Sequence, residues 1–247
     1  MPETNSWVEG TRTIELREGE IHVWRARLDC HESLLPKFAA TLSSDETSRA
    51  ERFRFSGDRN GYIVGRGILR ELLASYLGCS PAELQFWYGP WGKPYLRQKN
   101  PSRLVHFNVS HSQGRALLAF AVGRNLGVDV EFVRADVAVD EIAERYFSGH
   151  EIAELKALPQ TMRAEGFFLC WTRKEAYIKA RGEGFRIPLD SFHVSLTPGG
   201  PELLESPDRS HWNLCSLSPD PGYVGALVAE GNDWQLRCWE WKPVDGC

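Results

Sequence analysis

Apolar positions recur along this chain with two periods, one typical of strands and one typical of helices. Residues 21–28 alternate apolar with polar side chains between turn-prone segments, which predicts a half-buried strand. Further strands are predicted at residues 81–88, 105–109, 115–122, 126–133, 191–196, 212–217, 223–229 and 234–241. Apolar residues at helical spacing predict helices over residues 44–55, 58–77, 139–146, 151–158 and 162–180.

Both halves of the chain therefore mix helices with strands, and this mixture predicts the α+β class. The strand at 126–133 begins a second half, so we place a break near Asn125. Residues 197–221 are rich in Pro, Ser and Asp, and we expect long loops there around the short strand at 212–217.

Length and charge narrow the class of protein. The 247 residues suit one large domain or two modest ones at about 150 residues per domain. A hydrophobic content of 42% excludes a disordered chain, and a net charge of -4 is a poor basis for binding nucleic acid. The longest apolar stretch, 116–122, is far shorter than the roughly 20 residues of a membrane-spanning helix. With no signal sequence readable in residues 1–10, we expect a cytoplasmic protein without a membrane partner.

Two acidic residues on one predicted strand are the first candidate site. Asp129 and Glu131 are two positions apart, so their side chains leave the same face of the strand about 7 Å apart. Oxygen ligands in this arrangement suit Mg²⁺, which proteins hold with one or two carboxylates together with substrate phosphates. The alternative is a solvated strand face, which shows the same alternation.

A predicted helix carries the second candidate. Trp171, Glu175, Ile178 and Lys179 share one face, and Glu175 and Lys179 have the spacing of an i,i+4 pair. A surface ion pair would give the same pattern.

Two further segments could bind an anion. Residues 107–112 form a strand that ends in hydroxyl and imidazole groups, although a lone histidine is more often structural. Residues 49–70 contain six Arg against two acidic residues, a local charge of +4 that could bind a phosphorylated ligand or lie on exposed helix faces.

These segments, taken in order, resemble one enzyme family. GKPY (92–95), FNVSHS (107–112), GVDVE (127–131) and WTRKEAYIKARGEGF (171–185) are similar to motifs of the 4′-phosphopantetheinyl transferase superfamily, of its surfactin-synthetase type. The resemblance covers residues 21–196 and continues more weakly to 241. It implies an enzyme that moves the phosphopantetheine arm of coenzyme A to a serine of an apo acyl or peptidyl carrier protein and releases adenosine 3′,5′-bisphosphate.

The resemblance also implies an architecture. Members of this family are a pseudo-dimer of two similar α/β subdomains, with coenzyme A in the cleft between them. Residues 1–124 and 125–247 would be the two subdomains, which agrees with the break near Asn125. A monomer is expected because one chain already supplies both sides of the cleft.

The same resemblance assigns roles to individual residues. Asp129, Glu131 and Glu175 would hold Mg²⁺ together with the pyrophosphate of coenzyme A. Glu175 would take the serine proton, directly or through a water on the metal, and Lys179 would stabilise charge on the pyrophosphate. The expected contacts to coenzyme A are Arg49, Arg66, Lys93, Pro94, Ser110, His111 and Lys179.

This chain departs from the family pattern at one place. Where related enzymes often carry a cation for the 3′-phosphate, it has Asp45, Glu46 and Ser48, so Arg49 and Arg66 are the expected substitutes. Two other functions stay open at this point. A magnesium-dependent phosphodiester hydrolase acting on coenzyme A would use the same carboxylates against water. A non-catalytic module that binds coenzyme A or a carrier protein would keep the fold without turnover.

Overall fold

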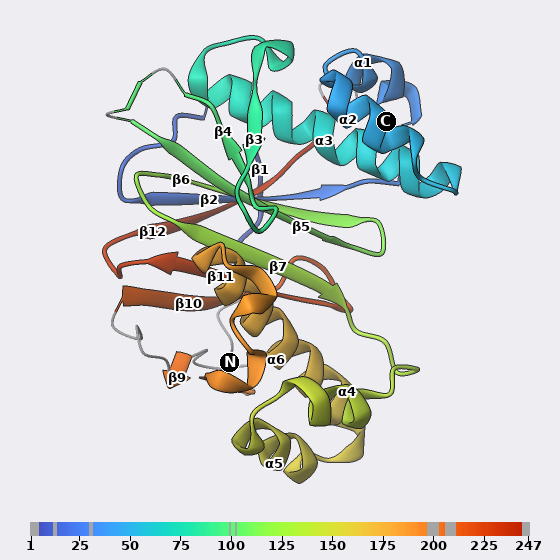
Figure 1. Ribbon diagram of the computed structural model, residues 1–247, viewed down its shortest axis with the longest axis vertical. Coiled ribbons are helices and arrows are strands. Elements are labelled where there is room, and N and C mark those ends of the chain that lie inside the picture. The colour runs from blue at the N-terminus through green and yellow to red at the C-terminus, as the bar shows by residue number, and fades with distance from the viewer. Residues whose placement is uncertain are drawn as a thin grey trace.

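Two β-sheets lie face to face in the computed structural model, and a long helix covers the outer face of each sheet (Figure 1). The structure describes residues 5–11, 14–29, 32–98, 100–101, 103–196, 203–205 and 211–243. Within the predicted loop region at 197–221, residues 197–202 and 206–210 lie outside the described residues, and the short strand predicted at 212–217 is found. None of the helices in the described part of the chain is long and apolar enough to cross a membrane.

The first sheet contains mainly strands from the first half of the chain. Its order is β1 (Val8–Glu9), β12 (Gln235–Glu240), β2 (Glu20–Arg27), β6 (Arg115–Val122) and β5 (Val105–Ser112). The helices of this half are α1 (Leu35–Ala39), α2 (Ser44–Glu51) and α3 (Ser56–Leu77). A hairpin of β3 (Phe86–Tyr88) and β4 (Pro94–Leu96) lies between α3 and β5 in the sequence.

The second sheet is smaller and belongs to the second half. Its order is β10 (Trp212–Leu217), β11 (Tyr223–Glu230) and β7 (Leu126–Phe132), and all its pairs are antiparallel. The helices are α4 (Val139–Tyr146), α5 (Gly149–Ala157) and α6 (Gln160–Arg181). A short pair, β8 (His193–Val194) and β9 (Leu203–Glu205), follows α6, and 3₁₀ turns occur at Glu32–Leu34, Pro81–Glu83, Gly184–Arg186 and Leu189–Ser191.

The two halves repeat one order of elements. Each begins with a strand, continues through two short helices and a long helix of 22 residues, and ends with a small two-stranded unit and an antiparallel pair. The first strand of each half also pairs with the last strand of that antiparallel pair, β2 with β6 and β7 with β11. The predicted α+β pseudo-dimer is thereby confirmed.

One strand departs from the expected division at residue 125. β12 comes from the second half, but it pairs in parallel with β2 and so belongs to the first sheet. Its Trp239 packs against Trp24 and His22 at ring distances of 6.0 and 5.9 Å. An unpaired edge strand exposes backbone donors and acceptors, and β12 covers this edge of β2.

Most predicted elements are found within a few residues of their expected bounds. The segment 81–88 is strand only over Phe86–Tyr88, because Pro81 begins a 3₁₀ turn closed by the reciprocal contacts of Ser80 and Glu83. β5 continues to Ser112, beyond the predicted end at Val109. The short helix α1 and strand β4 were not expected.

Three apolar cores separate the layers. One lies between α3 and the first sheet, where Ile68, Leu73 and Phe120 are buried. Another lies between α6 and the second sheet, around Tyr177 and Val228. The third fills the space between the two sheets and is built from alternate residues of their facing strands: Ile21, Val23, Leu117, Ala119, Ala121, Leu126, Val128, Val130, Leu227 and Ala229.

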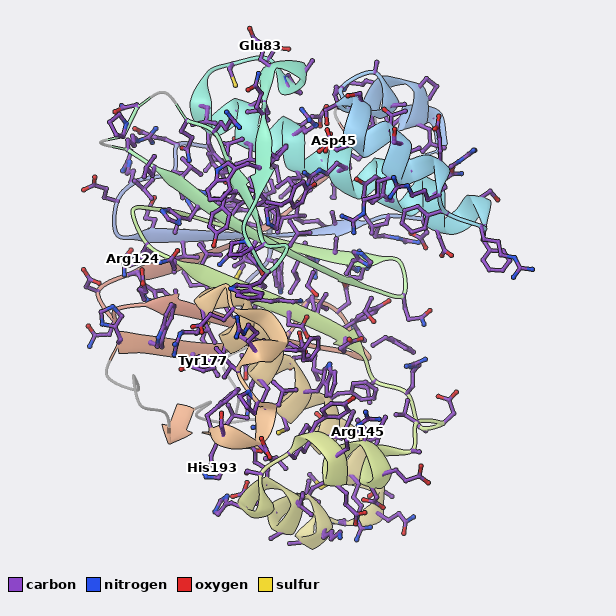
Figure 2. All side chains as sticks on the ribbon, in the orientation of Figure 1. Asp45, Glu83, Arg124, Arg145, Tyr177 and His193 are labelled. Atoms are coloured by element: carbon purple, nitrogen blue, oxygen red, sulfur yellow. The ribbon has the colours of Figure 1, made fainter. Side chains whose placement is uncertain are left out.

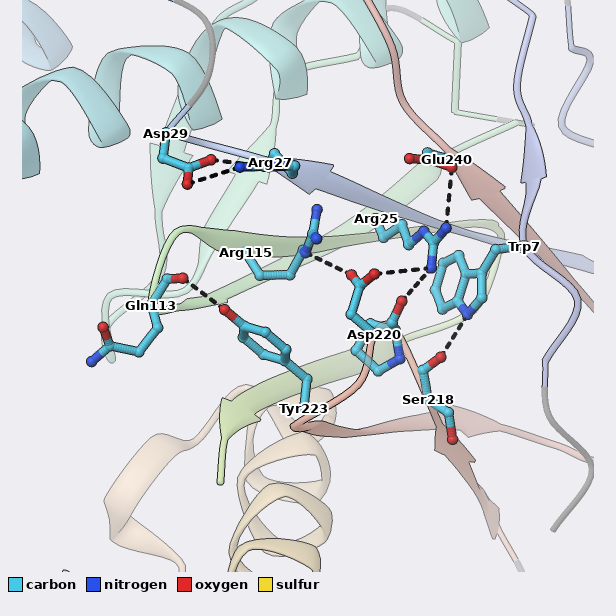
Figure 3. A network of polar contacts seen from close by, with 11 residues as sticks. Trp7, Arg25, Arg27, Asp29, Gln113, Arg115, Ser218, Asp220, Tyr223 and Glu240 are labelled. Carbon is cyan, nitrogen blue, oxygen red and sulfur yellow. Dashed lines mark hydrogen bonds and ion pairs between the residues drawn. The ribbon is translucent and has the colours of Figure 1, made fainter. Parts of the chain in front are cut away.

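A polar network also joins the two sheets (Figure 3). Asp220, which follows β10, accepts ion pairs from Arg25 of β2 and Arg115 of β6, the latter at 2.7 Å. Nearby, the Trp7 indole donates to the Ser218 carbonyl at 2.8 Å. These contacts bridge the first sheet and the β10–β11 turn, and they hold the two halves together.

The contact between β7 and α6 requires a glycine. A Cβ atom on Gly127 would lie 2.2 Å from the Ala176 carbonyl oxygen and 2.3 Å from the Ala180 nitrogen. Both are backbone atoms of a buried helix, so they cannot move aside cheaply. Gly127 therefore allows α6 to lie directly on the strand that carries Asp129 and Glu131.

We predict that Gly127→Ala lowers the free energy of unfolding by about 2 to 3 kcal/mol, because the added methyl group forces the helix away from the strand. Denaturant unfolding would measure the change. Gly61→Ala is the matched control: Gly61 lies inside α3 with no atom within 4 Å of the added Cβ, so this variant should be stabilised by up to about 1 kcal/mol. Equal stability of the two variants would contradict the proposed close packing.

Candidate functional site

β5 of the first half and β7 of the second half lie side by side without backbone pairing. Side-chain oxygen atoms of β5 accept hydrogen bonds from backbone N–H groups of β7, and we call this contact the seam. Alternate residues of β5 point their oxygen atoms at the backbone N–H groups of alternate residues of β7. The three contacts are Asn108 Oδ1 with the Val128 N–H at 2.9 Å, Ser110 Oγ with the Val130 N–H at 3.4 Å, and Ser112 Oγ with the Phe132 N–H at 3.2 Å. The polar residues of the FNVSHS motif thus close the edge of the second sheet.

The same hydroxyl groups hold the two carboxylates of β7. Ser110 donates to Asp129 Oδ1 at 2.7 Å, and Ser112 donates to Glu131 Oε2 at 2.7 Å. Asp129 and Glu131 point away from the apolar core between the sheets, on the strand face that also includes Gly127. Since Gly127 contacts α6, both carboxylates lie on the α6 side of β7.

Helix α6 supplies the remaining polar side chains. Trp171, Glu175 and Lys179 form a half-exposed stripe on a helix whose other sides are largely buried. The Lys179 ammonium lies 2.6 Å from Asp129 Oδ1 and 3.2 Å from Ser110 Oγ. The structure therefore brings together residues that are 50 positions apart, as the resemblance to the family implied.

Burial disfavours the charged forms of Glu131 and Glu175. Burial raises the pKa of Glu175 to about 7; the Lys179 ammonium lowers it, and the charges of Asp129 and Glu131 raise it. Burial also raises the pKa of Glu131, against the hydrogen bond from Ser112. In the described part of the chain, buried Asp129 Oδ2 and Glu175 Oε1 have no hydrogen-bond partner. Such a group of acidic oxygens favours a cation.

These residues fit an open Mg²⁺ site better than a closed one. Among the described residues, no three His, Cys, Asp or Glu side chains gather closely enough to enclose a metal. Mg²⁺ does not need such a cage, because it keeps several waters and completes its shell with substrate phosphates. The donors here are all carboxylate oxygens, and two of these oxygens are buried without a partner.

A pocket beside α2 is suited to a nucleotide. It has a volume of about 710 Å³ and is lined by Asp45, Ser48, Arg49, Arg52, Phe53 and Tyr88. Asp45 is labelled next to α2 in Figure 2. Arginine can pair with phosphate, and an aromatic ring can stack on a base.

His111 lies between this pocket and the carboxylates. It is on the opposite face of β5 from Ser110, and the residue keeps part of its surface exposed. Desolvation of the imidazole lowers its pKa; the charges of Lys179 and Arg49 lower it further, and the charge of Asp129 raises it. Arg49, His111 and Lys179 are therefore electrostatic neighbours.

Arg66 is not brought to this pocket. Its guanidinium pairs with Glu46 and lies 4.1 Å from the centre of the Phe86 ring. Arg70 pairs with the same carboxylate at 2.6 Å, and this pair is almost fully buried. Glu46, which stands where a cation was expected, is thus a buried structural acceptor between α2 and α3. We leave Arg66 out of the proposed binding site for this reason.

Lys93 makes contacts that the sequence did not predict. Its ammonium donates to the carbonyl oxygens of Leu126, Lys179 and Ala180 at 3.2, 2.6 and 3.1 Å. Burial lowers its pKa to about 8. The charge of Lys93 is therefore directed at the C-terminal end of α6. Lys93 and the next residue, Pro94, also line a separate cavity of about 140 Å³.

Two kinds of residue in the motifs were not predicted to have a role. The first kind is Asn108 and Ser112, which were not selected as site residues although they share one strand face with Ser110. In the α6 motif, Lys174 is fully buried and pairs with Glu151 at 2.8 Å, so it holds α6 to α5 instead of entering the cleft.

Comparisons with known proteins match both halves. Residues 28–122 match the family profile described as "4′-phosphopantetheinyl transferase, N-terminal", and residues 125–228 match "4′-phosphopantetheinyl transferase superfamily". The 4′-phosphopantetheinyl transferase HetI of Nostoc is 39% identical over 96% of this chain and 99% of its own length. The chain belongs to the 4′-phosphopantetheinyl transferase superfamily.

A second curated relative agrees with this assignment. Sfp of Bacillus subtilis, a 4′-phosphopantetheinyl transferase, is 29% identical over 80% of this chain and 86% of its own length. The crystal structure of Thermotoga maritima holo-[acyl-carrier-protein] synthase is 22% identical with a TM-score of 0.36, covering 43% of this chain and 62% of that one.

The resemblance to the surfactin-synthetase type is confirmed, and the protein is a transferase that passes phosphopantetheine from coenzyme A to carrier proteins.

We predict that Lys93→Met destabilises this transferase by about 2 kcal/mol, because two carbonyl groups at the end of α6 and one at the start of β7 lose their shared donor. Since α6 carries Glu175 and Lys179, kcat should fall while the KM for coenzyme A changes little. Steady-state kinetics and denaturant unfolding would measure both effects. A raised KM with unchanged kcat and stability would instead favour a direct contact with coenzyme A.

The raised pKa of Glu175 predicts a pH dependence of stability in metal-free protein. Between pH 4.5 and 7 the folded state keeps a proton that the unfolded state loses, so stability should decrease as pH rises through this range. Glu175→Gln removes this loss. At pH 8 in EDTA we expect the variant to be more stable than the wild type by about 2 to 3 kcal/mol, and at pH 4.5 the two should be similar. A pH-independent difference would contradict the raised pKa.

Proposed function

We propose that this transferase is magnesium-dependent and that the seam between β5 and β7 is its active site. The observation that carries the proposal is the meeting of Asp129, Glu131, Glu175 and Lys179 where the two halves join. In the proposed reaction, a serine hydroxyl of an apo acyl or peptidyl carrier protein attacks the phosphorus that bears the pantetheine arm of coenzyme A. The pyrophosphate P–O bond breaks, and adenosine 3′,5′-bisphosphate leaves.

Asp129, Glu131 and Glu175 are the residues that would hold Mg²⁺. When bound, the ion supplies positive charge that neutralises the pyrophosphate and the three carboxylates together. Lys179 adds a fixed positive charge at the same place, on the side of Asp129. Charge that develops on the leaving pyrophosphate oxygen would be stabilised by this ammonium.

Glu175 is the proposed general base. In the metal-free protein burial raises the pKa of Glu175 to about 7, and a carboxylate placed beside the reacting phosphate can accept the proton of a serine hydroxyl. Its place on α6, one turn before Lys179, puts the base and the cation on the same half-exposed stripe. Glu175 would take the proton from the serine hydroxyl, either directly or through a water.

The nucleotide end of coenzyme A is proposed to lie along Arg49 and His111. Arg49 lines the pocket beside α2 with Arg52, Phe53 and Tyr88, which supply cations for phosphate and rings for the adenine. Ser110, which donates to Asp129, borders the carboxylate end of the path from this pocket, and Pro94 is left out of the proposal because it lines a separate cavity. Neutral His111 would gain a proton when a phosphate approaches, because the negative charge raises its pKa.

The test is intact-mass analysis of a panel of apo carrier proteins incubated with the enzyme, coenzyme A and Mg²⁺. We expect each served carrier to gain one phosphopantetheine, and EDTA to abolish the gain. Glu175→Gln should reduce transfer at least about 100-fold while coenzyme A still binds, because the base is lost and the nucleotide contacts remain.

Three outcomes would contradict parts of the proposal. Release of free phosphopantetheine without a modified carrier would indicate the hydrolase. Coenzyme A binding without any product would indicate a binding module. Transfer that is unchanged in Glu175→Gln would remove Glu175 from the catalytic role.

A further inference from the structure

Each serine hydroxyl of the seam both accepts a hydrogen bond from a backbone N–H group and donates one to a carboxylate. A hydroxyl has one hydrogen to donate and two lone pairs to accept with. Ser112 accepts the Phe132 N–H at 3.2 Å and donates to Glu131 at 2.7 Å. One side chain therefore fixes the backbone of β7 and a carboxylate that extends from it.

The type of each polar residue along β5 matches the residue that lies beside it on β7. Asn108 only accepts a backbone N–H, and the residue beside this contact is Gly127, which has no side chain. Ser110 and Ser112 stand beside residues 129 and 131, where a carboxylate must also be held. A purely structural seam would need an acceptor at each place but no donor.

The two carboxylates differ in how well they are held. Asp129 has a second partner, the Lys179 ammonium at 2.6 Å. For Glu131, Ser112 is the one side-chain donor found in the described part of the chain. Glu131 is also the longer side chain, with more rotamers to lose when it binds a cation.

We infer that Ser112 is a positioning residue, which orients the Glu131 carboxylate for the metal by tying it to the seam between the halves. The inference rests on the proposed magnesium site. Ser112 itself needs no contact with substrate or metal: it acts by keeping Glu131 in one orientation before the ligand arrives. Outer-shell hydrogen bonds of this kind typically contribute 10- to 100-fold to metal affinity.

The experiment measures the binding of Mn²⁺, as a spectroscopic probe for Mg²⁺, by electron paramagnetic resonance in the presence of coenzyme A. We expect Ser112→Ala to weaken Mn²⁺ binding about tenfold, and Ser112→Thr, which keeps the hydroxyl, to restore most of it. In transfer assays, Ser112→Ala should raise the Mg²⁺ concentration needed for half-maximal rate by a similar factor, with little change in the KM for coenzyme A.

Asn108→Ala is the matched control, because it removes a seam hydrogen bond of the same kind without freeing a carboxylate. It should lower the unfolding temperature but change the Mn²⁺ dissociation constant less than twofold. If Asn108→Ala and Ser112→Ala weaken Mn²⁺ binding equally, the effect is loss of the seam alone and the inference is overturned.

A double-mutant cycle separates this inference from the proposed function. If Ser112 acts through Glu131, Ser112→Ala should have no further effect on Mn²⁺ affinity in the Glu131→Gln background. Weaker binding in Glu131→Gln together with wild-type binding in Ser112→Ala would overturn the positioning role and leave the metal site standing. Wild-type binding in Glu131→Gln would overturn the metal site itself.

Discussion

The structure depends on how two sheet edges meet without sharing a backbone ladder. β7 begins the second half, and its N–H groups on the side of β5 would be costly if buried without acceptors. Asn108, Ser110 and Ser112 provide these acceptors from side chains, so the two halves join at a distance that leaves room for carboxylates beside the seam. A direct backbone pairing would have closed this space. The geometry of the proposed site is thus a consequence of the way the halves are connected.

The long helix of the second half is held from several directions, and each contact affects the site. Gly127 lets α6 lie against β7, Lys93 binds the carbonyl groups at its C-terminal end, and the buried Lys174–Glu151 pair ties it to α5. Breaking a buried pair or donor of this kind costs more than forming it gains, because the remaining partner stays desolvated. Residues far from any ligand therefore control where Glu175 and Lys179 stand. Glu175 and Lys179 lie on the half-exposed stripe, which is the side of α6 that these contacts do not bury.

The two halves have the same order of elements but different tasks. The first half supplies Arg49, His111 and the β3–β4 hairpin, and the second supplies the three carboxylates and Lys179. Among the described residues, side-chain contacts of this kind are found between β5 and β7, so the proposed site occurs once despite the repetition. β12 crosses from the second half to cover the free edge of β2, which adds backbone hydrogen bonds between segments far apart in the sequence. The polar network around Asp220 joins the halves again near that crossing.

Local patterns in the sequence predicted most of the elements and suggested the residues of the proposed site. Alternation and helical spacing predicted the strands that carry Asp129 and Glu131 and the helix that carries Glu175 and Lys179, since these periods follow from backbone geometry alone. Pairings between distant segments were decided by the tertiary structure. No local pattern distinguishes Arg49, which lines a pocket, from Arg66, which Glu46 neutralises, because the difference is the position of α2 against α3. Likewise Lys93 and Ser112 acquire their contacts only when the hairpin and β5 meet α6 and β7, and β12 finds its partner across the whole chain.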